Sequence, residues 1–258
     1  LTQILQVTPA ALVHDLHPDY LTTGITRGGE ELPWPPGTPV MAVQHHHAHI
    51  LSCQAESGLT GPYVGIALDG TGYGTDGTVW GGEILLVDGT RMERKGHLRP
   101  VWMPGGEKAI EEPWRMAVSC LTRTTGLDRL RPDLFNGIPE EDIRIVGRLC
   151  EKESHGIMTT SAGRLFDAFS ALLGVCTRSR YEGQAAMELE AAADPYETAG
   201  LPFALARPNV VYADLDGSII VCNEKFTEMH GARGGPEAQV GRNVREFFAE
   251  ESLSKLRA

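Results

Sequence analysis

"YVGIALDGTGYGTDGTVWGGEILLVDG", residues 63–89, decides the fold expected for this chain. Two apolar, strand-like runs flank a glycine-rich segment. Gly72, Gly74 and Gly77 spell GxGxxG, but the residues that follow lack the helix start that a dinucleotide-binding loop requires. The stretch therefore predicts an antiparallel hairpin. Its loop either offers consecutive backbone N–H groups to an anion or simply turns the chain.

Upstream, "VMAVQHHHAHILSCQAESG", residues 40–58, predicts a short strand that enters a helix ended by Gly58. In that helix His45 and His49 lie one turn apart on the same face, which makes half of a divalent-metal site. Asp69, at the end of the next apolar strand, supplies a third, oxygen ligand. The alternative is a surface histidine pair. Cys53 continues the same face, but a lone cysteine of this kind is more often a small core residue.

The rest of the chain alternates strand-like runs with amphipathic helices, which is typical of α/β domains. A strand and its exit loop are expected in "ALVHDLHPDY", residues 11–20, and helices are expected within 111–126, 139–153, 159–174 and 182–195. The proline-rich segment that follows indicates a domain boundary. We expect one domain over residues 1–199 and a second over 208–258, where strand, Asp-Gly turn, strand and helix follow one another.

Composition narrows the possible functions. The 258 residues carry a formal net charge of -11, so the chain lacks the basic surface that nucleic-acid binding requires. Five scattered cysteines with no CxxC pair indicate reduced thiols in a cytoplasmic protein. No apolar run is long enough to span a membrane, and the amino end has neither signal-peptide character nor a starting Met.

Several blocks, in order, carry a resemblance to a known family: "VHDLHPDY", "VQHHHAHI", "LDGTGYGTDGTVWGGE", "MPGGEKAIEEPWR", "SAGRLFDAFSALLG" and "YEGQAAMELEA". Over about residues 1–195 the chain resembles the Kae1-like domain of HypF, the hydrogenase-maturation carbamoyltransferase family. The resemblance implies a partial α/β domain of the actin/sugar-kinase/Hsp70 type, in which two lobes surround a nucleotide cleft.

The resemblance also implies an activity and a site. The family forms carbamoyl-adenylate from carbamoyl phosphate and ATP, which brings Mg²⁺, and passes the carbamoyl group to the C-terminal cysteine of a HypE-like acceptor protein. His45, His49 and Asp69 match its ligands for zinc or iron. The positions that match its nucleotide and phosphate site are Gly70, Thr71, Gly72, Gly74, Asp167, Glu182 and Gly183. Taken without the resemblance, the sequence favours Asp167 as a surface charge on a helix and Glu182 as a helix cap. Arg115 and Arg164 either hold phosphate or are solvated or ion-paired.

Departures from the family pattern leave alternatives open. The family's acylphosphatase-like, zinc-finger and YrdC-like domains are not found in the sequence, and its second lobe, with a further aspartate ligand, is expected to be missing. Residues 208–258 instead resemble the opening of a PAS sensor domain. The alternatives are a PAS-containing signalling module on a non-catalytic scaffold, a Kae1-type tRNA threonylcarbamoyl-transfer protein and an O-carbamoyltransferase. "HHHAH" departs from the HxEGH pattern of the tRNA branch.

Overall fold

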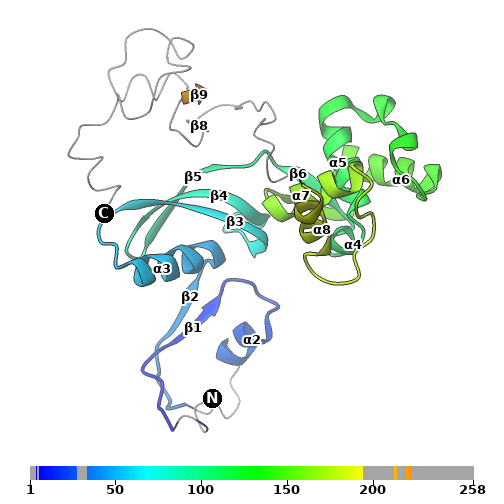
Figure 1. The fold of residues 1–258 in the computed structure, drawn as a ribbon. Coiled ribbons are helices and arrows are strands. Elements are labelled where there is room, and N and C mark those ends of the chain that lie inside the picture. The colour runs from blue at the N-terminus through cyan, green and yellow to red at the C-terminus, as the bar shows by residue number, and fades with distance from the viewer. Residues whose placement is uncertain (1–3, 5, 28–33, 194–211, 214–218, 222–258) are drawn as a thin grey trace. The chain divides into compact units, whose positions relative to one another are not determined.

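A computed structural model describes residue 4 and residues 6–27, 34–193, 212–213 and 219–221. The chain divides into two units, Leu1–Pro195 and Tyr196–Ala258. Figure 1 shows the elements of the first unit in chain order. They are β1 (Leu12–Asp15), α2 (Leu21–Arg27), β2 (Val40–Val43), α3 (His45–Ser57), β3 (Tyr63–Tyr73), β4 (Val79–Asp88), β5 (Arg91–His97), β6 (Val101–Pro104), α4 (Lys108–Glu111), α5 (Trp114–Thr125), the 3-10 turns η1 (Leu127–Arg129) and η2 (Pro132–Leu134), α6 (Glu140–Glu151), β7 (Gly156–Thr159), α7 (Ala162–Leu172) and α8 (Gln184–Ala192).

The predicted hairpin is confirmed as β3 and β4, the first two strands of a five-stranded sheet in the order β3-β4-β7-β6, with β5 also paired to β4. The two strands are antiparallel, and their register shifts between Leu68 and Gly72. Gly77, with a φ of 76°, closes the turn by donating its N–H to the Gly74 carbonyl at 3.1 Å. Asp69 therefore lies inside the strand, at an irregularity of its pairing, and not at the end that the sequence predicted.

Helix α3 covers one face of this hairpin, and its bounds agree with the prediction. Gln44 caps the first turn by accepting the His47 N–H at 2.9 Å, and Gly58 ends the helix in the left-handed conformation. The buried contact between helix and hairpin is a small apolar cluster: Ile50, Ala67, Trp80, Leu85 and Val87. The other face of β3 presents Val64, Ile66 and Leu68, which are 63–68% exposed.

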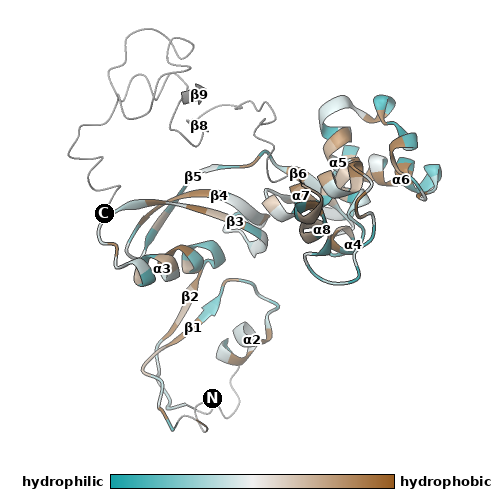
Figure 2. Ribbon diagram, in the orientation of Figure 1, coloured by the Kyte–Doolittle hydropathy of each residue, from teal (hydrophilic) through white to brown (hydrophobic). Residues whose placement is uncertain are grey.

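The larger core lies among the helices beyond β6 (Figure 2), where α7 and α8 are coloured as hydrophobic. Trp114, Met116, Val118, Ile143 and Val146 are at most 2% exposed there. Helix α5 follows Pro113 and ends at Gly126, as predicted, and Ser161 caps α7 by accepting the Arg164 N–H at 3.0 Å. These helices fix the position of α7, which borders the candidate site.

A second, two-stranded sheet brings the amino-terminal segment to the site. Strands β1 and β2 are parallel, and their register pairs Asp15 with Val43, two residues before α3 begins. This sheet and α3 are continuous in the chain, so the end of β1 lies beside the start of the helix.

Of the second unit, the structure describes β8 (Tyr212–Ala213) and β9 (Ile219–Val221), an antiparallel pair. The helix predicted after this hairpin lies outside the described residues.

Candidate metal centre and adjoining cavity

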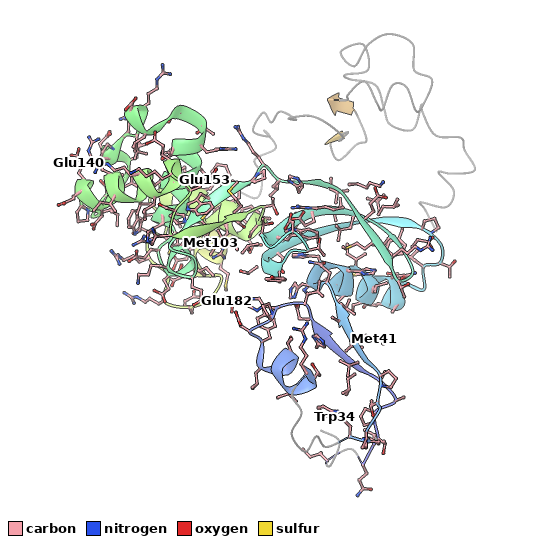
Figure 3. All side chains as sticks on the ribbon, turned by 180° about the vertical axis from the view of Figure 1, so that it is seen from behind. Trp34, Met41, Met103, Glu140, Glu153 and Glu182 are labelled. Carbon is pink, nitrogen blue, oxygen red and sulfur yellow. The ribbon has the colours of Figure 1, made fainter. Side chains whose placement is uncertain are left out.

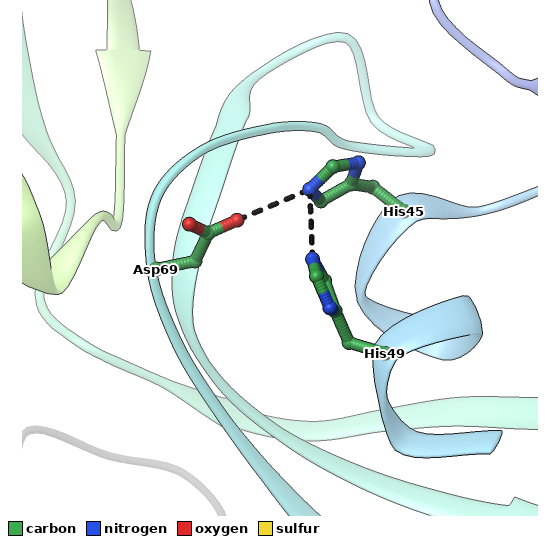
Figure 4. Close-up of side chains that lie close together, drawn as sticks. All are labelled: His45, His49 and Asp69. Atoms are coloured by element: carbon green, nitrogen blue, oxygen red, sulfur yellow. Dashed lines mark hydrogen bonds and ion pairs between the residues drawn. The ribbon is translucent and has the colours of Figure 1, made fainter. Parts of the chain in front are cut away.

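His45, His49 and Asp69 come together in the structure, with their ligand atoms all within 4.8 Å of one another (Figure 4). The two imidazole Nε2 atoms are 3.2 Å apart, and the Asp69 Oδ2 atom is 3.2 Å from His45 Nε2. Tetrahedral zinc with bonds of about 2.0–2.1 Å separates its ligand atoms by roughly 3.3 Å. The two measured separations match that value.

The electrostatics of Asp69 favour a cation at this point. Its pKa is lowered to about 2, first by the close contact of His46 and then by the Gly70 N–H, against the burial that raises it. The carboxylate is therefore ionised at neutral pH. Its Oδ2 atom is inaccessible to solvent and has no hydrogen-bond partner of good geometry among the described residues. A divalent cation would satisfy this buried oxygen, so the donor set fits the expected metal.

The other two histidines of the cluster, His46 and His47, are oriented by hydrogen-bonding partners of their own. Gln44 accepts the His47 N–H through its oxygen, so its amide nitrogen donates to the Tyr73 carbonyl at 3.1 Å and to His46 Nδ1 at 3.3 Å. His46 must then carry its proton on Nε2, which lies 3.3 Å from Asp69 Oδ2. His46 thus turns an N–H, and not a lone pair, toward the carboxylate, although the contact falls short of hydrogen-bond geometry and leaves Oδ2 without a partner.

His47 is buried and lies 3.2 Å, through Nε2, from the Gly89 carbonyl, which only accepts hydrogen bonds. The sequence pattern did not reveal the roles of His46 and His47. The sequence showed only that His46 and His47 do not share the helix face of His45 and His49, because they are not spaced four residues apart. It did not show which groups they contact.

Gly72 is required by the close approach of the strand to these rings. A Cβ atom at this position would lie 2.3 Å from Cε1 of His46 and 3.0 Å from Cδ2 of His45. Two other predicted loop positions have local roles: Gly74 donates its N–H to the Thr78 carbonyl at 2.9 Å, and the Gly70 N–H donates to Asp69 Oδ1 at 2.6 Å. These N–H groups are engaged within the hairpin, so the loop offers fewer free donors than the sequence predicted.

Beside the hairpin lies a cavity of about 620 Å³, whose lining includes Thr71, Lys108, Arg164, Arg178 and Glu182. Figure 3 labels Glu182, in the loop that precedes α8. Lys108 and Arg178 form ion pairs with Glu111 and Glu112, at 2.8 and 2.6 Å. The cavity thus joins two of the predicted nucleotide positions, Thr71 and Glu182. Gly183 follows them as the cap of α8, with a φ of 77°.

The cavity contains one unusual cation. The Arg164 side chain is only 5% exposed, and its Nε and Nη1 atoms lack hydrogen-bond partners among the described residues. Its contact is with Asp167, whose Oδ2 atom is 3.1 Å from Nη1. Burial lowers the pKa of Arg164, and burial likewise raises the pKa of Asp167 to about 6, against the attraction of the guanidinium. The alternative of Asp167 as a surface charge is wrong.

Two further expectations need correction or placement. Cys53 is exposed, not buried, and it lines a separate cavity of about 370 Å³ that runs along α3 and β3 and reaches His49 and Asp69. Arg115 is ion-paired with Glu112 at 2.6 Å, which is one of the alternatives that the sequence left open.

The fold and the site define an α/β protein with a histidine–carboxylate cluster next to a cavity that contains a buried arginine. Two family models match the chain: the HypF Kae1-like domain over residues 1–56, and the second subdomain of the carbamoyltransferase Kae1-like domain over residues 65–231. The second match covers more than half of the chain, so this protein belongs to the HypF carbamoyltransferase family.

Similar proteins agree. The chain is 42% identical over 217 residues to Carbamoyltransferase HypF2 of Cupriavidus necator, covering 84% of this chain and 26% of that protein. It is 42% identical over 191 residues to Carbamoyltransferase HypF of Rhizobium leguminosarum bv. viciae, covering 74% and 24%. A crystal structure of full-length HypF in the phosphate- and nucleotide-bound form has a TM-score of 0.64 and 39% identity, over 73% of this chain and 24% of that one. The chain spans about a quarter of the length of these relatives.

The comparisons give the PAS-like interpretation no support, and the second-subdomain match extends to residue 231, into that segment. Within the described residues, no helix has the length and apolar character needed to cross a bilayer.

Proposed function

We propose that this chain carries the metal-binding part and one wall of the nucleotide-binding part of a HypF-type carbamoyltransferase. The observation that carries the proposal is the convergence of His45, His49 and the unpartnered Asp69 Oδ2: all three ligand atoms lie within 4.8 Å of one another, and His45 Nε2 is 3.2 Å from each of the other two. Zinc or iron fits the two imidazoles and one carboxylate. When bound, the cation would polarise a phosphate or carbonyl oxygen of the substrate.

The chain's own residues would then divide the work. Asp69, ionised by its low pKa, and the two imidazoles would hold the cation, while His46 would orient the carboxylate. Arg164 lines the cavity and would neutralise a phosphate there, because a buried guanidinium without good hydrogen bonds gains much from an anionic partner. Thr71 and Glu182 line the same cavity: the Thr71 hydroxyl would donate to a phosphate oxygen, and the Glu182 carboxylate would accept from ribose hydroxyls.

Activity, substrates and partners follow from the family as proposals. By that reasoning water releases phosphate from carbamoyl phosphate, and the resulting carbamate attacks the α-phosphorus of ATP, with Mg²⁺, to give carbamoyl-adenylate and pyrophosphate. The thiolate of a HypE-like acceptor then attacks the carbamoyl carbon as AMP leaves. The solved full-length relative is described as phosphate- and nucleotide-bound, which supports placing both ligands in this family. We keep the division at residues 1–199 and 208–258 as a proposal and assign the latter segment no ligand.

Metal titration tests the proposal. We expect the purified chain to bind one equivalent of zinc and the His45→Ala/His49→Ala variant to lose it. His97→Ala, which removes an exposed imidazole of β5, should bind zinc as the unmodified chain does. Equal zinc affinity in the double variant would contradict the proposed centre.

Nucleotide binding tests the cavity. Arg164→Gln should weaken the binding of a fluorescent ATP analogue at least tenfold, whereas Arg91→Gln, at an exposed position of β5, should leave it unchanged. If the two variants bind the analogue equally well, Arg164 does not contact phosphate.

A further inference from the structure

A carboxylate lies on the opposite edge of the His45 ring from the proposed cation. The Asp15 Oδ2 atom is 2.8 Å from His45 Nδ1, and the Asp15 side chain is 15% exposed. Its other oxygen, Oδ1, accepts the His17 N–H at 2.9 Å, and its main-chain carbonyl accepts the Thr23 hydroxyl at 3.1 Å. Hydrogen bonds therefore hold both the carboxylate and the main-chain carbonyl of Asp15, and they fix the direction of the carboxylate.

The contact fixes the protonation pattern of the ring. An ionised carboxylate only accepts hydrogen bonds, so the neutral imidazole of His45 must carry its proton on Nδ1. The lone pair is then on Nε2, the atom that lies 3.2 Å from both His49 Nε2 and Asp69 Oδ2. Histidines that bind metals commonly donate their other ring N–H to a carboxylate, which sets the tautomer and orientation of the ring.

The topology explains how a residue thirty positions away reaches His45. Parallel pairing of β1 and β2 places Asp15 beside Val43, and α3 begins two residues after Val43. The sequence "VHDLHPDY" showed only a strand and its exit loop. It did not show that the strand ends against the helix.

We propose that Asp15 is a positioning residue of the metal centre: it holds His45 in the Nδ1–H tautomer so that Nε2 points at the cation. This inference rests on the proposed metal-binding function, but its claim about the tautomer holds for the metal-free chain as well. Asp15 does not touch the cation, and its removal acts through His45.

The test compares Asp15→Asn with Asp19→Asn in the full chain. The Asn side chain keeps the shape of Asp15 and loses its charge, while Asp19 is an exposed carboxylate of the loop that follows β1, so its variant controls for net charge. We expect Asp15→Asn to weaken zinc binding about 10- to 100-fold, measured by competition with a chromophoric chelator, and Asp19→Asn to leave it within about twofold. Thermal unfolding of the metal-free variants establishes that both are folded.

A second readout does not depend on the metal. Long-range ¹H–¹⁵N spectra of the metal-free chain should show His45 as the Nδ1–H tautomer, and Asp15→Asn should shift that ring toward a tautomer mixture. If Asp15→Asn binds zinc as tightly as the unmodified chain while His45→Ala does not, the positioning role is wrong and the metal centre stands. If the unmodified chain binds no zinc, the proposed function fails. The spectra then decide for Asp15: an Nδ1–H ring that depends on Asp15 supports the role, and any other result overturns it.

Discussion

The pair of Arg164 and Asp167 makes a quantitative prediction about stability and pH. Burial raises the pKa of Asp167 to about 6 from an ordinary value of 3.8, and the guanidinium only partly opposes this. The folded state therefore prefers the protonated acid, so the associated stability is fully present below about pH 3.8 and is lost as the pH rises through about 6. A shift of about two pKa units corresponds to a penalty of roughly 3 kcal/mol at neutral pH.

Asp167→Asn should remove that penalty because Asn resembles the protonated acid and does not ionise. We expect urea unfolding to give similar free energies of unfolding for the variant and the unmodified chain near pH 3.5, below the ordinary pKa of the carboxyl. The variant should then become more stable, relative to the unmodified chain, by up to roughly 3 kcal/mol at pH 7.5. Asp128→Asn, at an exposed position, is the control and should show no such trend.

The sign of this difference is the decisive result. If the variant loses stability relative to the unmodified chain as the pH rises, the carboxylate is ionised and stabilised by Arg164, and attraction outweighs burial. A difference that does not change with pH would also refute the reasoning, because it would mean that Asp167 has the same pKa in the folded and unfolded states.

Three further outcomes follow from the packing. Gly72→Ala should weaken zinc binding at least tenfold, because its Cβ would displace the His46 ring, whereas Gly24→Ala, with open space around it, should not; isothermal titration compares the two. Ser161→Ala should lower the free energy of unfolding by about 1 kcal/mol in urea titrations, because it removes the amino-terminal cap of α7. Ile66→Lys should raise the concentration at which the chain precipitates and leave its melting temperature within a few degrees, because that side chain is 68% exposed on the outer strand β3.

Local signals predicted the elements that carry the metal ligands. Gly58 and the apolar periodicity before it predicted α3, whose cap at Gln44 only the structure reveals, and the hairpin follows from its two apolar runs around a glycine turn. Because i and i+4 positions share a helix face, the spacing of His45 and His49 was enough to predict that their rings meet. These inferences need only residues that are near one another in the chain.

Long-range pairing could not be predicted in the same way. Strand β5 has the sequence RMERKGH, with five charged or imidazole side chains among seven residues, and it becomes a strand because β4 supplies hydrogen-bond partners. Glu83 lies in an apolar stretch of sequence that does not show which groups satisfy its charge. It is fully buried, and it accepts hydrogen bonds from Arg94, at 2.6 Å, and from two backbone N–H groups. Asp167 and Cys53 show the same limit, since burial depends on which elements cover a helix face.

The proposed centre draws its groups from two separate sheets. Asp15 ends β1 of the two-stranded sheet, Asp69 belongs to β3 of the five-stranded sheet, and α3 contributes His45 from a position between them. A cation bound by His45, His49 and Asp69 would link α3 to β3, and Asp15 would connect β1 to the same site through His45. Binding energy that depends on this arrangement must also stabilise it. A metal bound at this centre would therefore also stabilise the fold, by holding α3 against the hairpin of β3 and β4.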